Sequence, residues 1–368
     1  MRSTVGISGL QAGEDVNIAT LKQRLLDLGA RPVHHDAILR AWLQAQPLDR
    51  GTRRQPGEHS FPLRLRQGLP ALADELAQVL RRRSEHPAQD GSRRWLLALA
   101  DELLIESVLL PRAGLCISSQ VGCAVGCRFC MTGRSGLLRQ LSSLEMVAQV
   151  VLARQKTTIR KVVFMGMGEP AHNLDQVIET IELLGTYGDI AHKNLVLSTV
   201  GDERVFSRLP QMRVKPALAL SLHTTRADLR AELLPRAPQI PPTDLIAAAE
   251  DYARRVAYPI QLQWTLLAGI NDGDDEIAAL ATLLRGKYAV LNLIPYNSLS
   301  RDGPSHEDYR RPDDAHIARM VAQLQRHGIL TKVRQSAGQD VDGGCGQLRA
   351  RAIDLRPRPS PRATQHAT

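Results

Sequence analysis

The sequence predicts an α/β protein, a partial (βα)6 barrel of the TIM type with a small helical domain in front of it. Three observations support this fold class. Six short apolar segments alternate with helical segments, which is typical of a parallel sheet covered by helices. Six units are fewer than the eight of a closed barrel, so we expect a barrel that is open on one side. The residues before this alternation show helical spacing instead.

The N-terminal domain is predicted to take residues 1–90 and to consist of helices. Helices are expected over residues 16–30, 34–46 and 69–84. In the first of them, Leu and Ile recur at helical spacing and Gly29 marks the end. Residues 49–63 are rich in Arg, Gly and Pro and predict a loop, whereas the polar stretch 84–92 predicts a linker.

The barrel domain is predicted to take residues 91–350, and it starts with a hairpin of residues 95–101 and 103–110. The six core strands are expected at 115–119, 161–166, 194–199, 216–223, 260–267 and 289–295. Helices are expected near 142–156, 173–186, 202–209, 225–233, 243–256, 275–286 and 313–327. The remaining residues, 351–368, are rich in Pro and Arg and predict a basic, disordered tail.

Basic residues gather towards the two ends of the chain. The net charge is +9, and residues 1–100 hold 15 Lys and Arg against 10 Asp and Glu, while residues 346–368 hold 5 against 1. The middle of the chain is neutral. Basic flanks around a neutral body favour contact with a nucleic acid. The alternative is a solvated surface in an Arg-rich chain, because 40 of the 47 cations are Arg.

The composition excludes several classes of protein. Hydrophobic residues make up 43% of the chain, which excludes global disorder. No run approaches the roughly 18 apolar residues that a membrane span needs, and the first residues lack the apolar core of a signal peptide. Aromatic residues make up 4%, which argues against broad platforms for stacking bases. We therefore expect a soluble, cytoplasmic protein without a membrane partner.

The cysteines are the most informative residues, at positions Cys116, Cys123, Cys127, Cys130 and Cys345. Their odd number argues against a secreted disulfide framework. Cys123, Cys127 and Cys130 form a C-x3-C-x2-C run directly after the first core strand. Such thiolates can hold one face of an iron–sulfur cubane and leave one iron open to a small molecule with an amine and a carboxylate. A zinc site with Cys116 as the fourth ligand and a Cys127/Cys130 redox dithiol stay open.

Six sequence blocks carry a resemblance to a known family. They are LCISSQVGCAVGCRFCMTG (115–133), MGMGEP (165–170), LSTVG (197–201), ALSLH (219–223), NLIPYN (292–297) and DVDGGCGQL (340–348). In this order they resemble the RlmN/Cfr family of radical S-adenosylmethionine (radical SAM) RNA adenine methyltransferases. The resemblance covers residues 16–350 and implies the radical SAM type of partial barrel.

The resemblance implies that an adenine ring carbon is methylated by a radical route. A 4Fe–4S cluster would be held by Cys123, Cys127 and Cys130, and two molecules of S-adenosylmethionine would be used per turnover. Cys345 would carry the methyl group as S-methylcysteine and become covalently joined to the RNA. Cys116 would then release the product by forming a transient disulfide with Cys345. An electron donor such as flavodoxin is also implied, and we expect a monomer. From the basic charge of the N-terminal residues we expect that the N-terminal domain contacts the RNA.

Further site residues follow from the same resemblance. Glu106, in the apolar stretch 103–110, is a candidate acceptor of the adenine ring proton, and its alternative role is that of an edge residue facing water. Residues at or just beyond strand ends, where such barrels bind ligands, are expected to contact S-adenosylmethionine. They are Gly168, Glu169, Ser198, Ser221, Leu222, His223 and Asn297. For the polar members of this set, the alternative role is loop capping.

The substrate is less closely defined. Family members that modify carbon 2 and carbon 8 of adenine share these motifs, and we favour carbon 2, although residues 136–141 have some likeness to the carbon-8 group. The RNA could be rRNA, tRNA or both. Two other function classes stay open: a radical SAM enzyme acting on a protein or small molecule, and a zinc-stabilised nucleic-acid-binding module.

Overall fold

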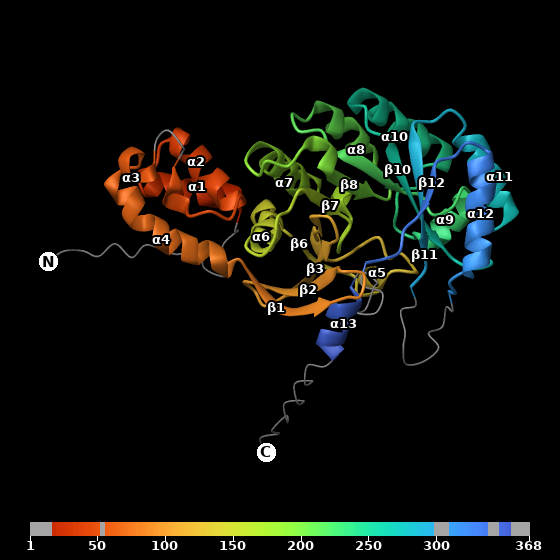
Figure 1. Ribbon diagram of the computed structural model, residues 1–368, viewed down its shortest axis with the longest axis horizontal. Helices are drawn as coiled ribbons and strands as arrows, with labels where there is room; N and C mark the ends of the chain where they lie inside the picture. Colours follow the sequence, from red (N-terminus) through yellow and green to blue (C-terminus); the bar gives the residue numbers. More distant parts are fainter. Residues whose placement is uncertain (1–16, 52–55, 298–308, 338–345, 355–368) are drawn as a thin grey trace, which may run out of the picture.

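The computed structural model describes residues 17–51, 56–297, 309–337 and 346–354, and a ten-stranded sheet forms its centre (Figure 1). In spatial order the strands are β1 (Leu80–Pro87), β2 (Arg93–Leu99), β3 (Leu104–Leu110), β4 (Gly114–Cys116), β7 (Lys161–Phe164), β8 (Leu195–Thr199), β9 (Ala217–Ser221), β10 (Ile260–Leu266), β11 (Ala289–Pro295) and β12 (Thr331–Val333). A separate ribbon pairs β5 (Gln120–Gly122) with β6 (Leu137–Gln140).

The sheet has a parallel part and an antiparallel part. Strands β4 and β7 to β12 run parallel to one another. Strands β1, β2 and β3 add to β4 as antiparallel neighbours. Because β1 and β12 stand at opposite ends of the order, the described sheet stays open, as expected for a partial barrel.

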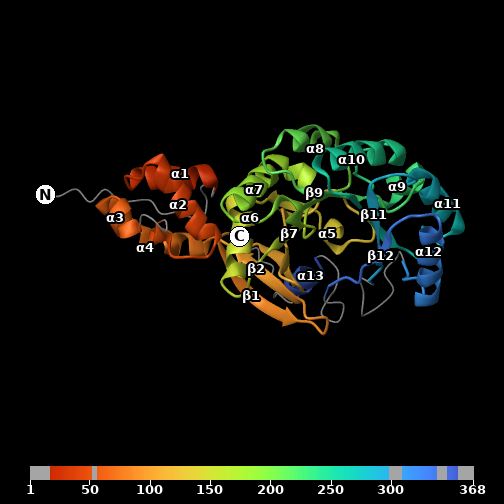
Figure 2. The same ribbon diagram turned by 45° about the horizontal axis from the view of Figure 1, so that its top comes forward.

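Helices cover the outer face of the parallel strands (Figures 1 and 2). They are α6 (Ser143–Arg154), α7 (Leu174–Thr186), α8 (Glu203–Arg208), α9 (Ala227–Leu233), α10 (Pro242–Val256), α11 (Asp274–Leu283) and α12 (Asp314–Arg326). Short helical turns lie at η2 (Pro170–Asn173), η3 (His192–Asn194), η4 (Leu209–Gln211) and α5 (Met131–Arg134). Near the C-terminus, α13 (Gln347–Asp354) packs beside α5 and β3 (Figure 2).

The predicted fold class is confirmed. All six core strands, the hairpin of β2 and β3, and the helix between each pair of parallel strands lie where the sequence predicts them. Local signals explain this success: α6 begins with a capping box in which Ser142 and Glu145 satisfy each other's backbone N–H groups. The seventh parallel strand, β12, was not predicted, because three residues are too few for a periodic pattern.

The helical domain ends earlier than predicted. It consists of α1 (Ile18–Asp27), α2 (Pro32–Leu43), η1 (Leu48–Arg50), α3 (Gly57–Ser60) and α4 (Leu63–Gln78). The predicted helix 69–84 and linker 84–92 are therefore wrong in part, because residues 80–87 form β1, which pairs with β2. As an edge strand, β1 exposes Arg81 and Arg83, so its sequence lacks an apolar pattern. The predicted loop 49–63 likewise contains two short helical turns.

The C-terminal boundary of the barrel domain also differs from the predicted one. Helix α13 runs to Asp354 and so crosses the predicted boundary at residue 350. Residues 355–368, for which the sequence predicts a disordered tail, lie outside the described residues. No helix in the described ranges is both long enough and apolar enough to cross a membrane.

The helical domain projects from one side of the barrel but is firmly joined to it (Figure 1). One apolar core is continuous from Ile18 in α1 to the strands of the sheet. Arg154, at the end of α6, donates hydrogen bonds to the carbonyl oxygens of Leu43 at 2.6 Å, Ile159 at 3.2 Å and Gly188 at 2.6 Å. Leu43 closes α2, so one guanidinium ties the helical domain to two loops of the barrel.

Replacing Arg154 is expected to weaken this junction. In Arg154→Met the three carbonyl groups lose their charged donor, and we expect the free energy of unfolding to fall by about 2 kcal/mol in urea denaturation. Arg160→Met is the matched control, because Arg160 is exposed on the loop that follows α6. Equal stability of the two variants would show that the Arg154 contacts do not hold the domain.

Candidate active site

The three clustered cysteines lie on one loop that leaves β5 and returns through β6. At its neck the Cys123 N–H donates to the Gly136 carbonyl at 3.0 Å. Two backbone bonds hold the loop against the end of α9 and the segment after it: Arg128 N–H to Leu233 O at 3.1 Å, and Arg236 N–H to Val125 O at 3.2 Å. The cysteine loop, residues 123–136, is thus fixed at its neck and along its length.

The thiols of the cysteine loop lie near one another. Burial raises the pKa of Cys123 to about 12, and burial together with the neighbouring Cys130 and Cys123 raises the pKa of Cys127 well above its ordinary value. Burial also raises the pKa of Cys130, although the N–H groups of Gly133 and Thr132 oppose this by bonding to its sulfur. The three thiols are therefore mainly protonated in this structure, and a bound cation would favour their thiolate forms.

The cysteine loop is tightly folded, and Cys116 lies apart from it. A Cβ atom on Gly133 would lie 2.9 Å from the Cys127 nitrogen, so this turn is tightly folded. Cys116 packs in a different apolar cluster, with Val108 and Val163. Among the described residues, no three His, Cys, Asp or Glu side chains are arranged around a single metal ion. Three cysteines on one loop are the number of protein ligands that leaves one iron of a 4Fe–4S cluster open.

Positive charge accompanies these thiols. Arg230 in α9 is buried and lies near both Cys127 and Glu169, and its guanidinium donates to the carbonyl of Val200. Burial lowers the pKa of Arg230 to about 10, while the two acidic groups act in the opposite direction. Arg230 remains a cation at neutral pH and offsets negative charge that thiolates would bring.

Glu106 is buried, with 2% of its surface exposed, and is not the water-facing edge residue of the alternative prediction. Arg94 on the neighbouring strand β2 forms an ion pair with it at 3.2 Å. The backbone N–H of Arg349 in α13 donates to its other oxygen at 2.8 Å. Both contacts stabilise the ionised carboxylate.

Arg94 also holds the chain on the other side of Cys345. Its Nε and Nη2 atoms each lie 3.2 Å from the carbonyl oxygen of Ala337. Cys345 itself lies outside the described residues, between Ala337 and Gly346. Gly346 has a φ of +84°, and a Cβ there would lie 2.5 Å from the Thr132 Oγ1 atom, two residues after Cys130.

Cys116 lies close to this ion pair. It is directly opposite Val108 on β3, and both Arg94 and Glu106 act on its thiol electrostatically. Burial raises the pKa of Cys116 to about 11, although Arg94 opposes the rise. The structure thus gathers Cys116, Glu106 and Arg94 on neighbouring strands.

The MGMGEP turn after β7 forms a second part of the site. Gly168 has a φ of +108°, and a Cβ there would lie 2.7 Å from both the Ser119 and Gln120 side chains. Glu169 is buried and accepts from the N–H groups of Ala171 and Val200, each at 3.0 Å. Burial raises the pKa of Glu169. This carboxylate caps two backbone turns, as the loop-capping alternative predicts.

The remaining predicted ligand contacts lie at neighbouring strand ends. Ser198 on β8 and Ser221 on β9 face each other, with 3.5 Å between their Oγ atoms. The Leu222 side chain is fully buried in the main apolar core, so only its backbone is available for the predicted ligand contact. Asn297 is half-buried and lies two residues after β11.

His223 is a buried, neutral histidine. Its Nδ1 atom accepts from the Thr265 N–H at 3.0 Å, and its ring lies 4.9 Å from that of Phe129 in the cysteine loop. Burial and the nearby Arg230 lower its pKa from 6.5 to about 3. It is therefore suited to packing and hydrogen bonding at neutral pH rather than to proton transfer.

Sequence reasoning missed several residues of this site. Arg94 and Arg230 were hidden because a charged residue in an apolar segment does not reveal its partner. For Arg94 a signal existed: Glu106 interrupts the next strand, and two opposite charges on adjacent apolar strands indicate a buried pair. Gln120 also went unnoticed, although its side chain accepts from the Glu169 N–H at 2.8 Å.

Comparisons with known proteins agree with this geometry. Residues 117–281 match the model of the radical SAM superfamily. Proteins named probable RNA methyltransferase from Ectopseudomonas mendocina (strain ymp) and Pseudomonas aeruginosa (strain UCBPP-PA14) are 64% and 65% identical to the chain. These matches cover 92% and 90% of this chain, and 97% and 94% of those proteins. A radical SAM methyltransferase from Sphaerobacter thermophilus matches with a TM-score of 0.75 at 32% identity, covering 92% of this chain and 98% of that one.

The partial barrel and its cysteine loop define a radical SAM protein. Within that superfamily, the chain belongs to the family of radical SAM methyltransferases that includes these three relatives. The superfamily implies a 4Fe–4S cluster and S-adenosylmethionine, so the family decides against the zinc module and the simple dithiol. The predicted class of enzyme is confirmed.

The low pKa of His223 predicts a dependence of stability on pH. Between pH 6.5 and about 3 the unfolded chain protonates this histidine and the folded chain does not. The free energy of unfolding should therefore decrease as the pH falls, by about 2 kcal/mol between pH 7 and pH 5 from this group alone. Urea denaturation at both pH values should show a smaller loss in His223→Asn than in the unaltered chain.

His327→Asn serves as the control, because His327 is exposed at the end of α12 and its replacement should leave the pH dependence as it is. If His223→Asn loses as much stability as the control over this interval, His223 takes up its proton at an ordinary pH in the folded chain.

Proposed function

We propose that the chain methylates a ring carbon of adenine in RNA, carbon 2 in preference to carbon 8, as a member of the RlmN/Cfr group. RNA as the substrate is supported by the names of relatives at 64% and 65% identity and by the basic flanks of the chain. The substrate would be rRNA, tRNA or both, in the cytoplasm. Flavodoxin or a similar electron donor and a monomeric enzyme belong to the same proposal.

One observation carries this proposal: the Arg94–Glu106 pair holds the chain on both sides of Cys345. Arg94 binds Ala337, Glu106 binds Arg349, and Cys116 lies beside the pair. Gly346, which is bonded to Cys345, packs against Thr132 just after the cluster cysteines. The proposed reaction needs four groups close together: a carrier cysteine, a resolving cysteine, a carboxylate and the cluster loop. The contacts of Ala337, Arg349 and Gly346 favour a position of Cys345 near the other three.

The residues take the following roles in the proposal. Cys123, Cys127 and Cys130 hold the cluster, and Gly168, Glu169, Ser198, Ser221, Leu222, His223 and Asn297 surround the place of S-adenosylmethionine. Cluster and S-adenosylmethionine together supply the single-electron chemistry and the methyl group, two molecules of the latter per turnover. Cys345 carries the methyl group to the ring, and Glu106, held ionised by Arg94, takes the ring proton.

Cys116 completes the cycle. Its thiolate attacks the Cys345 sulfur, an S–S bond forms, and the bond from that sulfur to the transferred carbon breaks. The electron pair stays with the carbon, which takes a proton and becomes the methyl group. A cellular dithiol then reduces the disulfide. Arg94 favours the thiolate form of Cys116 against the effect of burial.

Cys116→Ala tests the proposal directly. Because Cys116 acts after the carbon–carbon bond has formed, the reconstituted variant should accumulate a covalent adduct with RNA, seen as a ribonuclease-sensitive band on a denaturing gel. Cys345→Ala is the matched control and should give no adduct. Repeated turnover by Cys116→Ala without a trapped species, or equal bands in both variants, would contradict the proposed mechanism.

RNA contact by the helical domain gives a second test. Arg64 and Arg66 are exposed on α4, and neutralising both in Arg64→Gln/Arg66→Gln should weaken RNA binding and lower the slope of log K against log[salt] by about 1–2. Arg255→Gln on α10 removes an exposed cation elsewhere and should leave the slope unaltered. Unchanged affinity of the double variant at moderate salt would place the RNA away from these arginines.

A further inference from the structure

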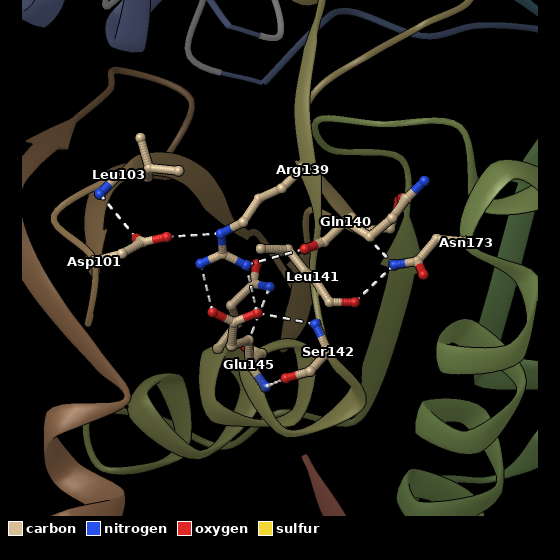
Figure 3. Close-up of polar contacts among 10 residues, drawn as sticks. Asp101, Leu103, Arg139, Gln140, Leu141, Ser142, Glu145 and Asn173 are labelled. Carbon is tan, nitrogen blue, oxygen red and sulfur yellow. Dashed lines mark hydrogen bonds and ion pairs between the residues drawn. The ribbon is translucent and has the colours of Figure 1, made fainter. Parts of the chain in front are cut away.

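The ribbon that carries the cysteine loop depends on one side chain. Arg139 lies on β6, directly opposite Val121 on β5, at the point where the chain leaves the loop. Figure 3 shows its guanidinium between Asp101, in the turn that joins β2 to β3, and Glu145, in the first turn of α6. The residue therefore connects the ribbon with two other parts of the barrel domain.

The contacts of Arg139 are short and directional. Its Nε donates to Asp101 Oδ2 at 2.7 Å, while Nη1 and Nη2 donate to the two carboxylate oxygens of Glu145 at 3.0 and 2.8 Å. Exposed ion pairs contribute little, but a bidentate pair with a buried carboxylate fixes geometry as well as adding energy. Glu145 is such a partner, since 6% of its surface is exposed.

Both carboxylates are themselves held in place. Glu145 accepts from the Ser142 N–H at 2.9 Å in the capping box, and Asp101 accepts from the Leu103 N–H at 3.1 Å (Figure 3). Neither partner can follow Arg139 if the ribbon shifts, because each is bound to its own backbone. The contacts thus transfer the rigidity of α6 and of the β2–β3 turn to β6.

The next residue links the ribbon to the predicted ligand site. Gln140 Oε1 accepts from Gln120 Nε2 at 2.7 Å, and Gln120 Oε1 accepts from the Glu169 N–H at 2.8 Å. Asn173 adds bonds to the carbonyl groups of Leu141 at 2.7 Å and Ser119 at 2.8 Å. The direction of β6 and the position of Glu169 are therefore coupled through side chains.

The neck of the cysteine loop leaves no room for adjustment. A Cβ atom on Gly122 would lie 1.8 Å from the Gly136 carbonyl oxygen, so the two chain segments are in direct contact there. Cys123 follows Gly122 immediately. A rotation of β6 would therefore also move Cys123, because no flexible segment separates the two.

We propose that Arg139 is a positioning residue of the radical SAM site: through Asp101 and Glu145 it fixes the β5–β6 ribbon and thereby sets how Cys123, Cys127 and Cys130 face Glu169. The inference rests on the proposed role of these thiols as cluster ligands. Arg139 touches neither the thiols nor the predicted ligand contacts in the described structure, and acts through the ribbon.

The test measures the reactivity of each thiol in the full-length, reduced, metal-free chain with iodoacetamide, followed by peptide mass analysis. Arg139→Gln should raise the alkylation rates of Cys123, Cys127 and Cys130 about tenfold, because the loop opens locally more often. Cys116 on β4 is outside the loop and should keep its rate. Arg139→Lys keeps the charge but not the bidentate geometry, so its alkylation rates should lie between those of the unaltered chain and of Arg139→Gln.

The matched control is Arg255→Gln, which breaks an exposed pair with Asp251 at 2.7 Å on α10 and should leave all rates unchanged. After reconstitution with iron and sulfide, Arg139→Gln should also lose iron to a chelator several times faster than the control. Rates in Arg139→Gln equal to those of the control would overturn the inference. So would an equal increase at Cys116, because that would report general loosening.

The same experiment separates this inference from the proposed function. If the thiol rates respond as expected but the reconstituted, unaltered chain binds no iron, the positioning by Arg139 stands and the cluster assignment fails. The opposite result is that the unaltered chain binds iron and Cys116→Ala forms the RNA adduct, while Arg139→Gln leaves the alkylation rates unchanged. The proposed function then stands and the inference fails.

Discussion

The buried ion pair between Arg94 and Glu106 is the contact on which the arrangement of the site depends. Both residues are buried on strands whose other buried residues are apolar except for Ser107, and an unpaired charge there would be strongly destabilising. The pair is stable there because Arg94 also reaches Ala337 and Glu106 also reaches Arg349. The C-terminal segments thus supply hydrogen-bond partners for the buried charges of the sheet, and these bonds fix the chain before and after Cys345. Apolar packing alone would not fix the C-terminal segments, since α13 is short and close to the end of the described chain.

The ion pair also gives the antiparallel strands β2 and β3 a role in the barrel domain. Strands β2 and β3 extend the parallel sheet beyond β4, and they bring Arg94, Glu106 and Cys116 side by side. A parallel barrel without this extension would hold the cysteine loop and the MGMGEP turn, but it would have no surface for the C-terminal segments. The extension therefore distinguishes this chain from a minimal parallel barrel in chemical terms, because it places the Arg94–Glu106 ion pair beside Cys116 of β4.

Much of the fold could be predicted from the sequence, because its strands are apolar and its helices begin at recognisable caps. The cysteine motif predicted an iron–sulfur site, although spacing alone left a zinc site and a redox dithiol open. What could not be predicted depends on contacts between distant residues. For the residues of β1 the sequence predicts the end of a helix and a linker. An arginine-rich edge strand lacks the alternating apolar pattern by which a strand is recognised. Arg94 on the adjacent strand could have been proposed as the partner of Glu106, but the second contact of Glu106, from α13, leaves no signal in the sequence. Arg139 carries no sequence signal at all, since its importance arises from where β6 ends.

Helix α6 has a property that follows from its two ends. Its first turn holds Arg139 through Glu145, and its last residue, Arg154, holds the helical domain through Leu43. With twelve residues it is a rod of about 18 Å. One end of this rod therefore contacts the helical domain, and the other contacts the ribbon that carries the cysteine loop. A displacement of the helical domain would reach the cysteine loop through a single helix.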